Sequence, residues 1–166
     1  MDLANKVALV TGGSRGIGAA TARALAANDV KVAVNGRDQA AIDGVVGELN
    51  DAGGTAIGVA ADVCDWSAIE AMRKRVEDEL GPVDVLVPFA GGFGGRTPVQ
   101  EISEDEWHSV IESNLTSTFL TVKSFVPGMI ERRSGSIVTM ASNAARFLDI
   151  TLTASYAAAK AGIAMF

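Results

Sequence analysis

The sequence predicts one α/β domain in which helices cover both faces of a doubly wound parallel sheet. Short runs that are apolar throughout alternate with longer amphipathic segments. Strands between two layers of helices have this composition because both of their faces are buried, and right-handed crossovers connect them. We expect strands near residues 6–11, 30–35, 55–61, 83–88 and 135–141. We expect helices near residues 16–28, 39–52, 66–80, 103–133 (broken near Asn114) and 155–166.

The length of 166 residues suits a single domain over residues 1–166. Five strands are fewer than the six that two complete mononucleotide-binding halves require. The last helical pattern runs to Met165 and Phe166 and ends there with no terminal glycine, capping residue or closing turn. We therefore expect the domain to be incomplete at its carboxyl terminus, truncated after the fifth strand and the following helix.

Composition excludes several classes of protein. Hydrophobic residues make up 48% and charged residues 20% of the chain, which is typical of a globular protein. A net charge of −6 argues against a nucleic-acid partner. No apolar run is long enough for a membrane helix and no signal peptide precedes the first strand, so we expect a cytoplasmic protein. The chain has one cysteine, Cys64, and one histidine, His108, which are too few for a disulfide within the chain or for a zinc site.

A glycine-rich turn follows the first predicted strand. Residues 11–18 read Thr-Gly-Gly-Ser-Arg-Gly-Ile-Gly and lead directly into a helical pattern. Backbone N–H groups and the positive end of the helix dipole meet at such a turn, and glycines let the backbone approach a pyrophosphate. An ordinary turn with surplus glycine is the alternative. The turn predicts a dinucleotide site that includes Gly12, Ser14, Arg15, Gly16, Ile17 and Gly18.

The end of the second predicted strand indicates which dinucleotide binds. Asp38 lies about 20 residues after Gly18, the spacing at which an acid selects NAD through the ribose 2′-hydroxyl. The strand, however, ends by Asn35, so Asp38 opens the next helix as its N-cap. Arg37 then lies at the tip, where a guanidinium suits a 2′-phosphate, and Arg15 could close on the same group. We expect NADP(H) in preference to NAD(H).

The third and fourth predicted strands also end in candidate site residues. Asp62 follows the third strand, where its carboxylate would accept a hydrogen bond from an adenine amino group or would cap the helix that begins near Ser67. Both alternatives stay open. After the fourth strand, Gly91 begins a run of four glycines around Phe93, a loop that could move over a ligand.

Two side chains near the end of the chain suit acid–base chemistry. Tyr156 and Lys160 are four residues apart on a predicted helix and therefore share one face. A phenol with a pKa of about 10 exchanges protons poorly at neutral pH. A neighbouring ammonium favours the phenolate and lowers that pKa, so the pair would serve as a general acid and base.

Other polar groups converge on the same edge of the sheet. Ser142 follows the fifth predicted strand, so its hydroxyl emerges at the carboxyl ends of the strands, where ligands of open α/β sheets bind. Asn114 is a poor helix former inside a long helical stretch, at a place where a bend could expose its carbonyl to a water. The residues that leave the other strands at this edge are Gly12, Arg37, Asp62 and Gly91.

Together these residues resemble the short-chain dehydrogenase/reductase family, whose fold is Rossmann-type. The resemblance covers residues 6–166. Within the family, the chain looks most like 3-oxoacyl-[acyl-carrier-protein] reductases and similar NADPH ketoreductases. The segments that carry it are Thr11-Gly12-x-x-x-Gly16-Ile17-Gly18, Asp62-Val63, Ala90-Gly91, Asn114, Ser142 and Tyr156-x-x-x-Lys160.

The resemblance implies a role for each of these positions. Tyr156 would give a proton to the carbonyl oxygen of a small-molecule substrate while NADPH delivers hydride to its carbon. Lys160 would lower the pKa of Tyr156 and bind the nicotinamide ribose, and Ser142 would bind the substrate oxygen. Asn114 would hold a water that links Lys160 to solvent. Val63, Ala90 and Gly91 would join the glycine turn in binding the cofactor.

The resemblance leaves alternatives and shows one local departure. An NAD-linked alcohol, hydroxysteroid or sugar dehydrogenase of the same family, or a catalytically silent dinucleotide-binding fragment, would share these features. A homo-oligomer, dimer or tetramer, is implied through the long helix after the fourth strand and the helix that carries Tyr156. Pro88 and Phe89 stand before Ala90-Gly91 where family members carry asparagine, so we expect different support under the cofactor pocket.

Overall fold

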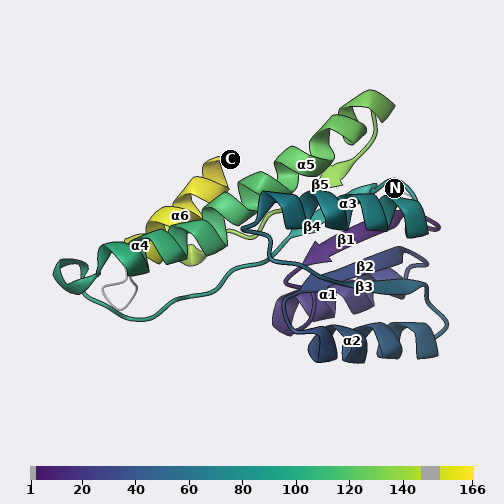
Figure 1. The fold of residues 1–166 in the computed structure, drawn as a ribbon, viewed down its shortest axis with the longest axis horizontal. Coiled ribbons are helices and arrows are strands. Elements are labelled where there is room, and N and C mark those ends of the chain that lie inside the picture. Colours follow the sequence, from purple (N-terminus) through teal and green to yellow (C-terminus); the bar gives the residue numbers. More distant parts are fainter. Residues whose placement is uncertain (1–2, 147–153) are drawn as a thin grey trace.

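The computed structural model describes residues 3–146 and 154–166 and shows the predicted α/β sheet with its helices (Figure 1). The strands are β1 (Val7–Thr11), β2 (Lys31–Gly36), β3 (Ala56–Ala60), β4 (Val85–Pro88) and β5 (Ser136–Ile137). The α-helices are α1 (Gly16–Ala26), α2 (Gln39–Asp51), α3 (Trp66–Leu80), α4 (Glu104–Ile111), α5 (Ser117–Arg132) and α6 (Ala154–Met165).

All strand pairs are parallel, in the order β3-β2-β1-β4-β5. The chain moves outward from β1 to β3, then crosses to the other side of β1 for β4 and β5. The order therefore reverses between β1 and β4, and a ligand crevice forms at such a switch point outside the carboxyl ends of the strands. This confirms the predicted doubly wound sheet.

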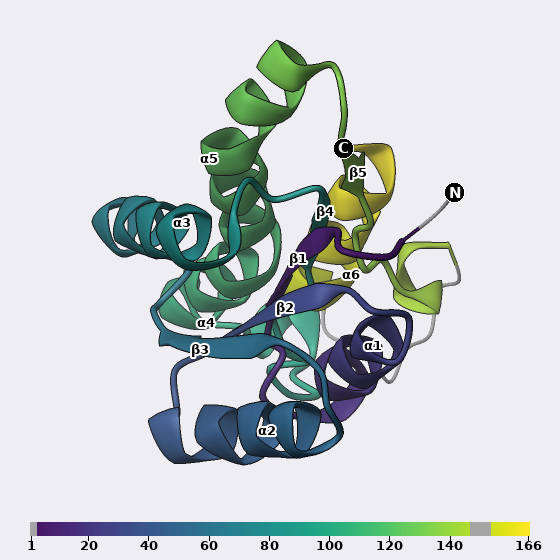
Figure 2. The same ribbon diagram turned by 90° about the vertical axis from the view of Figure 1, so that its right-hand side faces the viewer.

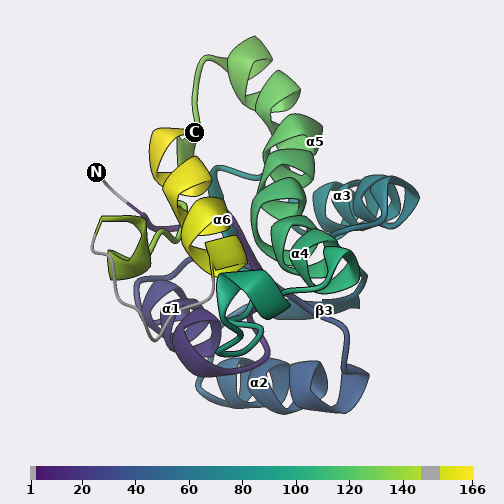
Figure 3. The same ribbon diagram turned by 90° about the vertical axis from the view of Figure 1, so that its left-hand side faces the viewer.

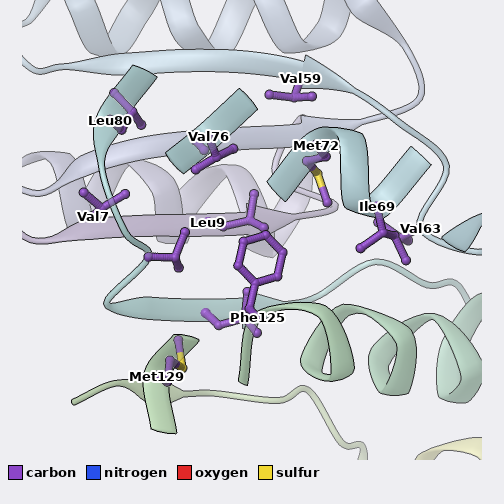
Figure 4. Close-up of a cluster of buried hydrophobic side chains, with 13 residues drawn as sticks. Val7, Leu9, Val59, Val63, Ile69, Met72, Val76, Leu80, Phe125 and Met129 are labelled. Atoms are coloured by element: carbon purple, nitrogen blue, oxygen red, sulfur yellow. The ribbon is translucent and has the colours of Figure 1, made fainter. Parts of the chain in front are cut away.

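Helices pack on both faces of the sheet. Figure 2 shows α1 and α2 on one side and α3 and α5 on the other. Alternate residues of β1 explain the two layers, because Ala8 and Val10 face the first pair of helices while Val7 and Leu9 face the second. On the second face, Phe125 of α5 packs against Leu9 and the apolar side of α3 (Figure 4).

The fifth strand is shorter than the sequence predicts. We expected residues 135–141, but the ladder spans only Ser136 and Ile137, paired with Val85 and Leu86. The Val138 N–H still donates to the Leu86 carbonyl, so the next donor from β4 would be the amide of residue 88. That residue is Pro88, which has no N–H. The proline therefore ends the pairing, a tertiary effect that the apolar pattern of residues 136–141 does not reveal.

The long helical stretch is broken where the sequence predicts. Residues Glu112–Thr116 form a single π-helical turn between α4 and α5, and such insertions are a recognised cause of helix bends. The turn contacts α6, where Gly162 comes so close to Leu115 that an added Cβ would lie 2.9 Å from its Cδ2. Figure 3 shows α6 beside α4 and α5 at this end of the molecule.

None of the helices in residues 3–146 and 154–166 combines the length and the apolar character needed to cross a membrane. The cytoplasmic location stays a prediction.

Candidate functional site

A cleft with a cavity volume of about 500 Å³ lies at the carboxyl ends of the strands. It brings together ten of the residues predicted to bind the cofactor: Gly12, Ser14, Arg15, Ile17, Gly18, Arg37, Asp62, Val63, Ala90 and Gly91. Five predicted residues are not part of its wall: Gly16, Asn114, Ser142, Tyr156 and Lys160.

The glycine turn is compact because its backbone segments nearly touch. Gly12 has φ +64°, and a Cβ there would lie 3.0 Å from the backbone nitrogen of Ala90. A Cβ on Gly18 would collide with the carbonyl oxygen of Gly12. Gly16 has φ +54° but open space around it, so its conformation rather than a contact requires glycine. This turn is a built structure and not a loop with surplus glycine.

The amino terminus of α1 differs from those of the next three helices. Asp38, Asp65 and Ser103 each accept a backbone hydrogen bond as N-caps of α2, α3 and α4. At α1 the N-cap is Arg15, and its side chain makes no capping hydrogen bond. The first-turn N–H groups of α1 therefore face the cleft without a side-chain acceptor, which leaves them for an anionic group.

The tip of the second strand is as predicted. β2 ends at Gly36, Arg37 follows with its side chain exposed at the cleft, and the Asp38 carboxylate accepts the Ala41 N–H at 3.2 Å. Because Asp38 caps α2, the group presented at the strand tip is a guanidinium. Asn35, buried at the end of β2, donates to the carbonyls of Val59 and Ala61 and so fixes the neighbouring end of β3.

Asp62 does not cap the following helix. Asp65 does so, by accepting the N–H groups of Ser67 and Ala68. The Asp62 carboxylate instead accepts the Cys64 N–H at 2.9 Å while its side chain remains exposed at the cleft. The alternative in which Asp62 caps the following helix is therefore wrong, because α3 begins at Trp66 and its N-cap is Asp65.

Cys64, for which we predicted no role, lines the same cleft. Its thiol lies 3.6 Å from the Glu112 carbonyl. Burial, followed by the negative charge of Asp62, raises the pKa of Cys64 to about 11. The thiol is therefore protonated at neutral pH and is a poor nucleophile.

Asn114 is fully buried in the π-helical turn and braces the loop after β4. Its Oδ1 accepts the Gly92 N–H at 3.3 Å, and its Nδ2 donates to the Gly92 carbonyl at 3.0 Å. Its own carbonyl accepts the hydroxyls of Ser117 and Thr118. The expected bend is present, but the carbonyl that we expected to meet water is occupied by these two hydroxyls.

Tyr156 and Lys160 lie on one face of α6, with the Lys160 Nζ 5.7 Å from the centre of the Tyr156 ring. Lys160 is only 5% exposed, and its Nζ donates to the Met140 carbonyl at 3.0 Å. Burial lowers the pKa of Lys160 below its usual value. Met140 also lines the cleft, so it connects this pair to the cofactor end.

Ser142 lies five residues beyond the last residue of β5, farther from the strand than we expected. It begins a short 3-10 helix, Asn143–Ala145, and its Oγ accepts the Ala144 N–H at 3.2 Å. This short helix packs against α6, so Ser142 is on the segment that meets the helix of Tyr156. Its hydroxyl keeps a proton to donate.

The floor of the cleft next to the glycine turn is held by a residue that the sequence analysis missed. The buried Thr11 hydroxyl accepts the Ala90 N–H at 3.1 Å, directly behind Pro88 and Phe89. A threonine at the end of a buried strand was the available signal. Other cleft residues without a predicted role are Asn35, Gly36, Ala61, Cys64, Phe89, Gly92, Gly94, Ser109, Ser113 and Met140.

Comparisons with known proteins agree with this architecture. The family model for short chain dehydrogenase matches residues 6–166. A 3-oxoacyl-[acyl-carrier-protein] reductase from Synechocystis sp. is 41% identical over 99% of this chain, and 2,3-dihydro-2,3-dihydroxybenzoate dehydrogenase from Bacillus subtilis is 38% identical over 97%. The chain spans 66% and 61% of the lengths of these two relatives.

Solved structures show the same fold. A tryptophan variant of actinorhodin polyketide ketoreductase with NADPH superposes with a TM-score of 0.90 at 38% identity, covering 95% of this chain and 60% of that protein. A short-chain type dehydrogenase/reductase from Mycobacterium marinum gives a TM-score of 0.94 at 30% identity, covering 99% and 67%. With the sheet order, the glycine turn and the Tyr156–Lys160 pair, these matches show that the chain belongs to the short-chain dehydrogenase family.

Proposed function

We propose that this protein is an NADPH-dependent reductase that converts a small-molecule ketone, of the 3-oxoacyl kind, to a secondary alcohol. The observation that carries the proposal is the pair on α6: a buried Lys160 whose Nζ lies 5.7 Å from the Tyr156 ring, joined to the cleft through Met140. The similarity to a 3-oxoacyl-[acyl-carrier-protein] reductase and a polyketide ketoreductase supports the substrate class.

The residues of the cleft fit a dinucleotide. The uncapped amino terminus of α1 offers backbone N–H groups to a pyrophosphate. Ile17, with 64% of its surface exposed, presents an apolar side chain at the cleft. Arg37 at the tip of β2 and Arg15 in the glycine turn favour a 2′-phosphate, and the exposed carboxylate of Asp62, which lines the cleft, would accept a hydrogen bond from adenine.

Each residue of the reacting end has one task in the proposed reaction. The nicotinamide cofactor supplies the hydride when it is bound. Tyr156 gives its phenolic proton to the carbonyl oxygen as negative charge develops there. Ser142 donates a hydrogen bond to the same oxygen. Lys160 holds its ammonium beside the phenol and would bind the nicotinamide ribose, and Asn114 braces the loop after β4 that lines the cleft.

The proposal is tested by replacing the acid without changing its shape. We expect Tyr156→Phe, in the protein at its full natural length, to lower the rate of NADPH oxidation with a 3-oxoacyl thioester at least about 1,000-fold. NADPH affinity, measured by calorimetry, should stay close to that of the wild type. A variant that oxidises NADPH at the wild-type rate would contradict the assignment of Tyr156. Tight NADPH binding by the wild type without turnover of any ketone would favour the catalytically silent alternative.

Cofactor choice tests the second candidate function, an NAD-linked alcohol or sugar dehydrogenase. The relative 2-dehydro-3-deoxy-D-gluconate 5-dehydrogenase, 33% identical to this chain, supports that candidate. If Arg37 binds the 2′-phosphate, Arg37→Asp should shift the ratio of kcat/KM values from NADPH towards NADH by about 100-fold or more. An unchanged ratio would contradict the assignment of Arg37, and a wild type that prefers NADH would favour the second candidate.

We also propose that the protein forms a homo-oligomer, dimer or tetramer, through α5 and α6. Exposed apolar side chains support this, since Phe119 of α5 is 44% exposed and contacts Phe166, which is 59% exposed, edge to face. Light scattering that gives the mass of a single chain would contradict it.

A further inference from the structure

We infer that Phe93 is a positioning residue for Tyr156, whose phenol ring it contacts edge to face. The two aromatic rings meet edge to face, with centroids 5.3 Å apart and planes at 79°. The Lys160 Nζ lies 5.7 Å from the same phenol ring. The inference rests on the proposed function, because it assigns a role in the reaction of Tyr156.

Phe93 is the only residue with a large side chain in the run Gly91-Gly92-Phe93-Gly94-Gly95. Four glycines give this segment little packing of its own and high conformational entropy. The ring of Phe93 contacts Tyr156, the only tyrosine of the chain. This contact joins the glycine-rich segment to α6. Edge-to-face contacts of this kind are favourable and depend on ring orientation.

The loop is held against the helices on both sides of Phe93. On one side, Asn114 exchanges two hydrogen bonds with the backbone of Gly92, and a Cβ on Gly91, at φ +144°, would lie 2.6 Å from the Asn114 Oδ1. On the other side, a Cβ on Gly94, at φ +82°, would lie 2.8 Å from a methyl group of Val110. Both approaches require glycine.

These contacts connect Asn114 to the proposed acid by a path through the loop. The Asn114 amide fixes Gly92, the next residue is Phe93, and the ring of Phe93 limits the position of the phenol. Gly92 and Gly94 line the cleft while Phe93 contacts Tyr156. The loop therefore forms part of the cofactor end and orients the reacting end at the same time.

The test combines a spectroscopic readout with kinetics on the protein at its full natural length. Tyrosines are replaced by 3-fluorotyrosine, and the fluorine resonance of Tyr156 is assigned by its loss in Tyr156→Phe. We expect Phe93→Leu, which keeps apolar volume but removes the ring, to shift that resonance. Trp66→Leu removes an aromatic ring at the start of α3 that is 39% exposed and contacts Lys123, and it should leave the resonance where it is.

The kinetic arm uses NADPH and a 3-oxoacyl thioester. We expect Phe93→Leu to lower kcat about 5- to 10-fold, the scale of one aromatic contact, with NADPH affinity within about twofold of the wild type. Phe93→Tyr, which keeps the ring, should restore kcat. A merely structural role would not separate the leucine from the tyrosine variant in this way.

The outcomes separate this inference from the function on which it rests. If Tyr156→Phe is inactive while Phe93→Leu keeps both kcat and the fluorine resonance of the wild type, the positioning role is overturned and the function stands. If Tyr156→Phe is fully active, the proposed function is overturned and the positioning role with it. If both variants behave as expected and Phe93→Tyr is as slow as Phe93→Leu, the ring contact is not the cause.

Discussion

The cleft and the polar groups beside it, which we propose as the cofactor end and the reacting end of one site, differ in how they are built. At the cofactor end the walls are backbone: Gly12 and Gly18 bring chain segments together at distances that exclude a Cβ. At the proposed reacting end the polar groups are side chains on α6 and on the π-helical turn, held by hydrogen bonds to backbone carbonyls. One end is therefore sensitive to any added atom, whereas the other is sensitive to the loss of particular polar atoms.

The difference predicts how each end fails. A clash in the glycine turn disturbs β1, α1 and the loop after β4 together, because all three meet there. Loss of a polar side chain at the proposed reacting end leaves the sheet intact and costs only what the hydrogen bonds of that side chain contribute. Substitutions at the first end should therefore affect stability and binding jointly, whereas substitution of Lys160 at the second end should separate stability from activity.

The largest effect is expected for Gly18→Ala. The new methyl group would collide with the Gly12 carbonyl oxygen, and backbone cannot move aside as a flexible side chain does. We expect a loss of about 3 kcal/mol in the free energy of unfolding, measured by urea denaturation, together with loss of measurable NADPH binding.

The matched control is Gly44→Ala in α2. Gly44 is exposed, and a Cβ there would meet no heavy atom within 4 Å, so the same change should stabilise the helix by about 0.5–1 kcal/mol. Opposite signs for the two alanines would show that the contact decides the result. A stable Gly18→Ala protein would refute the account of the turn.

The next largest effect is expected for Asn114→Ala. This change removes a fully buried amide and leaves the N–H and carbonyl of Gly92 without their partner. We expect about 2 kcal/mol of destabilisation and a shift of the Tyr156 fluorine resonance as the loop loosens. The exposed Asn28, whose amide donates only to the Ala24 carbonyl, is the control, and Asn28→Ala should cost less than about 0.5 kcal/mol. Equal losses in the two variants would refute the bracing role.

Local patterns predicted the geometry of the glycine turn and of the neighbouring strand ends. A glycine-rich turn between a buried strand and a helix is typical of a site that binds a phosphate group. The positions of the strand ends follow from the fold class. The choice of Arg37 over Asp38 also came from local reasoning, because a strand that ends at residue 35 or 36 leaves Asp38 free to cap α2, as it does.

Contacts between distant segments escaped prediction. β5 is short because Pro88, 48 residues before Ser136, has no N–H with which to continue the pairing. The apolar pattern of the fifth predicted strand does not show this. Two further contacts depend on the path of the backbone between elements. They are the hydrogen bonds from two hydroxyls to the Asn114 carbonyl and the contact of the Phe93 ring with Tyr156. The sequence identified the chemistry of these side chains but not the partners that hold them.

The smallest change in stability is expected for Lys160→Met. This substitution should raise the stability of the fold and abolish the activity. Burial of the Lys160 ammonium opposes folding, and the pKa of Lys160 is lowered for that reason. Met140, which accepts its hydrogen bond, lies half-buried at the cleft and can bind water instead. Methionine keeps the length without the charge, so we expect stability at neutral pH to rise by up to about 1 kcal/mol while ketone reduction is lost.

The pH dependence of this difference gives a sharper test. Below the lowered folded pKa, Lys160 is protonated in both the folded and the unfolded chain, so the wild type bears the full cost of burying the charge. As the pH rises through the lowered folded pKa, the folded state releases its proton first, and above the ordinary value of 10.5 both states are neutral. The stability advantage of Lys160→Met should therefore shrink as the pH approaches 10.5, while the other lysines titrate equally in both proteins and cancel. An advantage that grows with pH, or a variant less stable than the wild type at every pH, would mean that the ammonium stabilises the fold through its hydrogen bond to Met140 more than its burial opposes it.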